Sequence, residues 1–180
     1  MTLRRRGLLV LPLLTLAGRA QAQAKLVVPL AWYGVRVEDN AFTVEMPGVP
    51  DHRVVNDVSQ RGTAFQLHSY SLEVGGYSYV AQTALYPADV DVSQPRAILQ
   101  AALNGRAQQL AGRKWTKADW REFSGATAVE SIGALAGGTA LRQLTLLKAR
   151  RFVSLAFLGS GAGATGVEAE RFFRSLKLSA

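Results

Sequence analysis

The side chains most able to do chemistry in this chain are its two histidines, His52 and His68, and there is no cysteine. A neutral imidazole can serve near pH 7 as a general base or as a metal ligand. The lack of cysteine excludes thiol catalysis, disulfides and thiolate-bound metal. His68 shares a strand face with Gln66 and Tyr70, and no carboxylate or second histidine stands beside it at metal-ligand spacing. We therefore predict no metal site and no cofactor, with both histidines as surface or hydrogen-bonded side chains.

The motifs of the common hydrolases are missing from the sequence. It contains no G-x-S-x-G, H-E-x-x-H or S-x-x-K pattern, so no activated nucleophile or zinc-binding helix is visible. Isolated carboxylates remain, among them Asp119, Glu122 and Glu130. A hydrolase-like enzyme would need one of the carboxylates to meet His68 in a cleft. The sequence favours a non-catalytic protein over that alternative.

A glycine-rich stretch, Gly161 to Gly166, matches the G-x-G-x-x-G pattern that cradles a dinucleotide pyrophosphate. It follows an apolar strand and opens a helix, which is the required local context. The chain then ends after that one helix, without the second parallel strand and the downstream acid of a nucleotide fold. We interpret the stretch as a glycine loop that leads into a helix.

The segment Arg113 to Arg121 interleaves cations with aromatic rings. Exposed tryptophans beside cations can bind sugars, acidic polymers or a partner strand. Trp115 and Trp120 are an odd number of positions apart, so a regular strand would place them on opposite faces. We predict a partner-binding surface of Trp115, Trp120, Arg121 and Lys117; the alternative is that both rings belong to the core.

Residues 1–24 have the composition of an export signal. Three arginines precede a short apolar run over residues 7–17, and small-residue sites allow cleavage after Ala22 or Ala24. The run is too short for a membrane anchor. We predict a soluble periplasmic protein without an integral membrane segment, exported by the Sec or the twin-arginine route.

Export also changes the charge of the working protein. The full chain has 21 basic and 13 acidic residues, a net charge of +8. Four arginines lie in the leader, which leaves 17 basic residues and a net charge of about +4. This excess favours acidic or envelope partners, whereas nucleic acid is in another compartment.

We predict that residues 25–34 form a lead-in tether and that residues 35–180 form a single domain of α+β class. Short connections between successive apolar runs require antiparallel pairing, which predicts one antiparallel sheet with two main helices packed on it. The two helices are marked by Ser93 as a cap and by a capping box of Thr165 and Glu168. The expected strands are 32–38, 42–46, one between Asp51 and Gly62, 65–74, 77–85, 114–123, 126–134, 139–147 and 151–158, and the expected helices 93–110 and 165–178.

Two segments resemble small exported bacterial proteins of unknown function. Phe42 to Pro50, FTVEMPGVP, resembles their F-x-V-x-x-P-G-x-P opening, and Ala169 to Leu178, AERFFRSLKL, resembles their closing helix. Such proteins are similar to the PsbP-like α/β/α sandwich, known from an extrinsic subunit of the photosynthetic oxygen-evolving complex. Ala149 stands where such hairpins commonly use glycine.

The resemblance implies a non-catalytic accessory module with no cofactor fixed by its fold. We predict that the chain binds a protein or an envelope component. The second alternative is a binder of a small apolar or amphipathic ligand held between helix and sheet.

Overall fold

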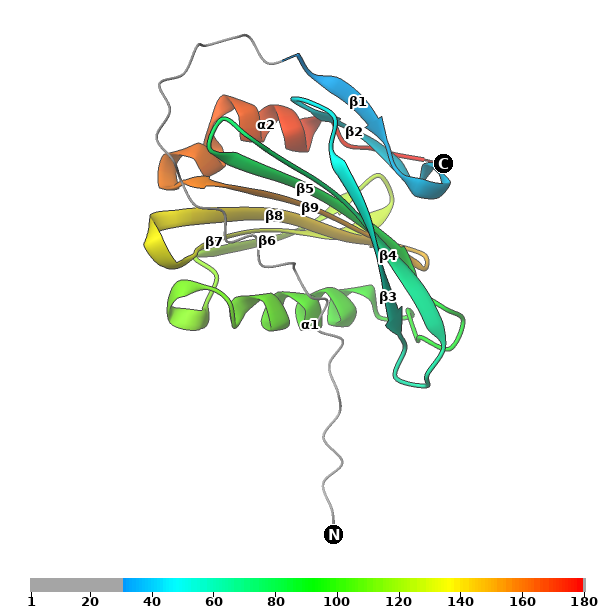
Figure 1. The fold of residues 1–180 in the computed structure, drawn as a ribbon. Coiled ribbons are helices and arrows are strands. Elements are labelled where there is room, and N and C mark those ends of the chain that lie inside the picture. The colour runs from blue at the N-terminus through cyan, green and yellow to red at the C-terminus, as the bar shows by residue number, and fades with distance from the viewer. Residues whose placement is uncertain (1–30, 180) are drawn as a thin grey trace.

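The computed structural model describes residues 31–179, which form two antiparallel sheets and two α-helices (Figure 1). The predicted export leader and most of the predicted tether lie outside these residues. The larger sheet has the order β3-β4-β5-β9-β8-β7-β6, with strands β3 (Asp51–Val58), β4 (Ala64–Val74), β5 (Tyr77–Leu85), β6 (Lys117–Phe123), β7 (Ala126–Ala134), β8 (Thr139–Lys148) and β9 (Arg151–Ser160). The α+β class and the antiparallel pairing predicted from the sequence are confirmed.

A second, smaller sheet corrects the prediction of a single sheet. It has the order β1-β2-β10, with strands β1 (Tyr33–Arg36), β2 (Phe42–Met46) and β10 (Lys177–Leu178). The end of the chain pairs here with its beginning, because Leu178 lies opposite Phe42. A two-residue strand has no periodicity of its own, so no local pattern predicts a second sheet.

The two helices cover opposite faces of the larger sheet (Figure 1). Helix α1 (Pro95–Ala107) lies on one face, and helix α2 (Val167–Arg174) lies with the smaller sheet on the other. Both helix starts differ from the prediction. Gln94, not Ser93, is the N-cap of α1, and Gly166, not Thr165, is that of α2, with no side-chain cap in either helix. Residues 161–165 instead form a 3₁₀ turn whose Ala164 is buried.

The central strands β5, β8 and β9 are buried on both faces, which explains their long apolar runs. On the α2 side, Phe42, Val44 and Met46 of β2 join Phe172 and Phe173 over the larger sheet. Under α1, Leu99 and Leu103 pack with side chains of the other sheet face, among them Phe65, Leu67 and Phe152. None of the helices among residues 31–179 is long and apolar enough to cross a membrane.

Arg142 of β8 links the larger sheet to α2. Its side chain is 9% exposed and lies 2.6 Å from both Glu130 of β7 and Glu170 of α2. Its guanidinium also covers the ring of Phe173 at 4.6 Å. Hydrogen bonding to Arg142 holds the pKa of the Glu170 carboxyl below its usual value of 4.5.

The lowered pKa of Glu170 predicts a pH-dependent contribution to stability. This contribution is complete above about pH 4.5 and is lost as the pH falls through the lower pKa of the folded protein. Glu170→Gln should therefore lower the free energy of unfolding at pH 7 by up to about 1 kcal/mol, because Glu170 is partly exposed to solvent. At pH 3 the difference in stability between the variant and the native protein should be smaller than at pH 7. Urea unfolding at both pH values measures this.

The matched control is Glu168→Gln, which removes the same charge from the first turn of the same helix. Among residues 31–179, Glu168 has no ion-pair partner within 4 Å. An equal loss of stability in both variants would assign the effect to the helix dipole instead of to Arg142.

Candidate functional site

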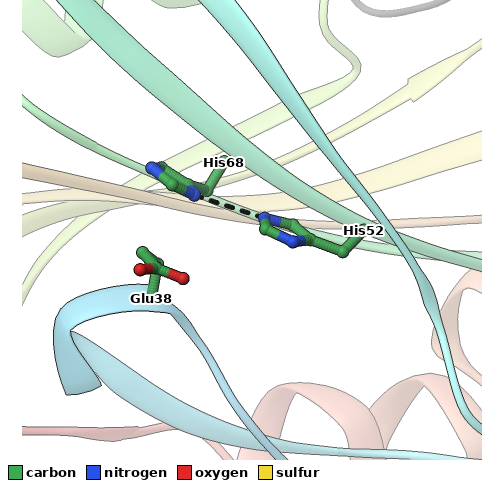
Figure 2. A group of neighbouring side chains, drawn as sticks. All are labelled: Glu38, His52 and His68. Carbon is green, nitrogen blue, oxygen red and sulfur yellow. Dashed lines mark hydrogen bonds between the residues drawn. The ribbon is translucent and has the colours of Figure 1, made fainter.

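The two histidines, far apart in sequence, meet on neighbouring strands. In the β3-β4 pair, His52 lies opposite Tyr70 and Val54 lies opposite His68. Because side chains alternate between faces, His52 and His68 are diagonal neighbours on one face. Their rings stack with centroids 5.4 Å apart, and His52 Nε2 lies 3.2 Å from His68 Nδ1 (Figure 2). One of these two nitrogens donates the hydrogen bond and the other accepts it.

Glu38 approaches the histidine pair from the smaller sheet. It opens the 3₁₀ turn Glu38–Asn40 between β1 and β2, and Figure 2 shows its side chain beside both rings. One possible ligand atom from each of Glu38, His52 and His68 lies within 4.8 Å of the other two. Both histidines are hydrogen-bonded near the surface, as predicted, but folding also places a second histidine and a carboxylate beside His68, which their sequence spacing did not indicate.

Tyr70 positions two of these three residues. Its ring stacks on His52 at 4.3 Å with the planes 9° apart, and its hydroxyl accepts a 3.0 Å hydrogen bond from the backbone N–H of Glu38. The ring is 8% exposed. Burial raises the pKa of Tyr70 above 10, opposed by that hydrogen bond, so the phenol stays neutral at physiological pH.

The surroundings of the three residues favour binding over catalysis. Glu38 and His52 are exposed and His68 is half-buried, so all three can reach a ligand from solvent. A hydrolase using His68 and a carboxylate would gain from a closed, dry cleft, where charge stabilisation is strongest. In this structure the Glu38 carboxylate lies beside His68 on an open surface.

A surface groove of about 470 Å³ begins at His68 and runs along the end of the larger sheet. Its apolar lining includes Leu85, which is 52% exposed, together with Phe65 and Tyr86. Asp39 and Arg151 supply opposite charges and lie 3.4 Å apart. The groove thus offers apolar contact and a cation beside the histidine pair.

Arg150 lines the same groove but supports its wall. Its guanidinium donates hydrogen bonds to the backbone carbonyls of Tyr86 at 3.0 Å, Val90 at 2.7 Å and Pro87. These contacts hold the loop after β5 against the turn between β8 and β9. The first residue of that turn, Ala149, has a φ of +51°, a conformation in which glycine would be less strained.

The predicted pair of tryptophans lies beside α1. Trp115 precedes β6, which begins at Lys117, so the alternation of a regular strand does not apply to it. Both Trp115 and Trp120 are partly buried and pack against the cluster beneath α1, which corrects their predicted placement on opposite faces. Trp115 Nε1 donates a 3.0 Å hydrogen bond to the carbonyl of Leu103, and Arg96 covers Trp120 at 4.7 Å.

Lys117 and Arg121, the cations of the predicted partner surface, are exposed on β6 at one edge of the larger sheet. Lys117 pairs with Asp119 at 2.7 Å, and Arg121 pairs with Glu130 at 3.1 Å. Charged pairs of this kind protect an edge strand against unspecific pairing. The partner surface of Trp115, Trp120, Arg121 and Lys117 remains a prediction.

The glycine-rich turn after β9 has a packing role. A Cβ atom at Gly163 would lie 2.9 Å from Cε1 of Tyr77, and one at Gly159 would lie 2.7 Å from Cδ1 of the same ring. The absence of side chains at these two glycines therefore allows the end of β9 and the turn after it to approach Tyr77 of β5 closely.

The fold has a counterpart among solved structures. The solution structure of cyanobacterial PsbP (CyanoP) from Synechocystis sp. PCC 6803 matches with a TM-score of 0.52 and 10% sequence identity, over 88% of this chain and 98% of that chain. A protein of unknown function from Pseudomonas aeruginosa, PA94, described as a putative regulator, matches with a TM-score of 0.44 and 16% sequence identity. That match covers 77% of this chain and 90% of that chain. No family model and no curated protein matches the chain. The CyanoP likeness confirms the predicted PsbP-like fold.

The Tyr70 hydroxyl can be tested by Tyr70→Phe. The variant keeps the ring on His52 and removes the acceptor for the Glu38 amide, so we expect a loss of about 0.5–1.5 kcal/mol in the free energy of unfolding. Urea unfolding measures the loss, and the backbone amide resonance of Glu38 should shift. Tyr33→Phe is the control, since Tyr33 is 52% exposed. Equal effects of the two substitutions would contradict the positioning role of Tyr70.

Proposed function

We propose that this chain is an exported, non-catalytic accessory protein that binds a protein or cell-envelope component at the groove beside His68. The groove is the observation that carries the proposal, because it combines exposed apolar surface with charged side chains at an open edge. The export signal in residues 1–24 and the PsbP-like fold support the same role.

The lining of the groove indicates the chemistry of its partner. Leu85 presents half of its side-chain surface to solvent near Arg151, which is partly exposed. An apolar side chain of a partner would bury Leu85, and an acidic side chain next to it would compete with Asp39 for the Arg151 guanidinium. We therefore expect the partner to offer a short segment with one apolar and one acidic side chain.

A small amphipathic ligand is the second candidate, and the groove volume favours it. About 470 Å³ lies within the usual range of small-molecule sites, roughly 300–1,000 Å³. We predicted from the sequence that such a ligand would lie between helix and sheet. In the structure, however, Leu99 and Leu103 fill the space beneath α1. Native mass spectrometry of the purified protein, before and after denaturation, separates a retained ligand from a protein partner.

Export can be tested by producing the full chain in a bacterium and fractionating the cells. We expect a processed periplasmic protein that begins at Gln23 or Lys25. Intact-mass measurement identifies the new terminus. Replacing both Ala22 and Ala24 by bulky residues should block processing, and an unprocessed cytoplasmic native chain would contradict the export proposal.

Partner binding can be tested by placing a photoreactive residue at Ala88, an exposed position in the groove lining. Illumination in an envelope extract should give a discrete adduct, identified by mass spectrometry. The same probe at Val167, which is 80% exposed and outside the groove lining, is the matched control. Leu85→Asp in the Ala88 background should reduce the adduct several-fold. Equal labelling from both positions would contradict a specific site.

A further inference from the structure

We propose that Glu38, His52 and His68 form a binding site for one divalent first-row transition-metal ion, such as Zn²⁺ or Cu²⁺. This inference does not depend on the partner groove, because the three side chains alone supply the ligands. It replaces the expectation, drawn from sequence spacing, that the chain has no metal site.

The separation of the two imidazole nitrogens fits chelation. Zinc lies about 2.0–2.1 Å from a histidine nitrogen, and two such nitrogens at a tetrahedral angle are about 3.3 Å apart. His52 Nε2 and His68 Nδ1 are 3.2 Å apart. The separation therefore matches that of two nitrogens bound to one zinc ion. On binding, the ring that donates the hydrogen bond carries its proton on its other nitrogen, so that both facing nitrogens offer a lone pair to the ion.

The strand register holds this geometry in place. His52 and His68 belong to strands that pair over eight consecutive positions, and Tyr70 supports the ring of His52 from one side. A site carried by paired strands loses less conformational entropy on binding than one carried by a loop.

Glu38 supplies the oxygen ligand and the negative charge. Its backbone is fixed by the Tyr70 hydroxyl, while its exposed side chain is free to rotate. The ligand atoms lie within 4.8 Å of one another, and a rotation of the Glu38 side chain can shorten the remaining distance. Two histidines and one glutamate leave further coordination positions open to water or to another ligand.

The donor set also predicts selectivity among metal ions. Imidazole nitrogen suits Zn²⁺, Cu²⁺ and Ni²⁺, whereas Mg²⁺ and Ca²⁺ prefer sites made of oxygen ligands. We therefore expect tight binding of Zn²⁺ and Cu²⁺ and no detectable binding of Mg²⁺ at the same concentration.

Calorimetric titration of the purified, tag-free protein with ZnCl₂ tests the site. We expect one ion per chain, and His52→Ala and His68→Ala should each weaken binding at least about tenfold. Glu38→Gln should also weaken it while preserving the fold, because Tyr70 holds the Glu38 backbone and not its carboxylate. Circular dichroism and thermal unfolding establish that each variant is folded.

Asp51→Asn is the matched control, since it removes an exposed carboxylate next to His52 that lies outside the cluster. It should leave zinc affinity unchanged. With Cu²⁺, electron paramagnetic resonance should show nitrogen coupling from two imidazoles in the native protein and from fewer in either histidine variant. An absence of binding, or equal binding by the double variant His52→Ala/His68→Ala, would overturn the proposal whatever the result of photocrosslinking.

Discussion

The structure depends on one packing constraint, the burial of the central strands on both faces. Strands β8 and β9 carry almost unbroken apolar sequence, so each face of the larger sheet needs its own cover. Helix α1 covers one face, and α2 covers the other together with β2. The smaller sheet therefore completes the hydrophobic core. Arg142 reinforces this second layer, because its buried side chain connects β7 and β8 to α2 through two glutamates.

The candidate site is a consequence of this second layer. When Phe42, Val44 and Met46 pack over the larger sheet, the turn before them brings Glu38 to the β3-β4 pair. Tyr70 contacts both partners, with its ring on His52 and its hydroxyl at the Glu38 backbone. One buried side chain thus couples the smaller sheet to the histidine pair. The groove beside His68 uses the same junction, because Asp39 of that turn pairs with Arg151.

These features support the proposed binding role. The histidine pair and Glu38 lie on an open surface, and the groove has the mixed lining of a binding site. A bound metal ion would add positive charge at one end of a groove that already contains arginine. The CyanoP likeness is one of fold, and the groove and the cluster are properties of this chain's own residues.

The sequence by itself determined the elements whose signals are local. The boundaries of β2 and β7 were predicted to the residue. Their signals are the alternation of apolar and polar side chains and the glycines of the adjoining turns, which involve only neighbouring residues. The apolar stripe of Ala169, Phe172, Phe173 and Leu176 was also correct, and all four side chains are buried. The helix starts were wrong where tertiary packing competed with capping, as at Thr165.

Only the tertiary structure decided the smaller sheet and the cluster of Glu38, His52 and His68. Strand β10 is two residues long, and it pairs because α2 delivers the chain end to β2. The two histidines are 16 positions apart, and their contact requires the register of β3 against β4. A hairpin register could have suggested that pair, whereas the approach of Glu38 has no signal in the sequence. It results from the packing of one sheet over another, which brings together residues that no local spacing connects.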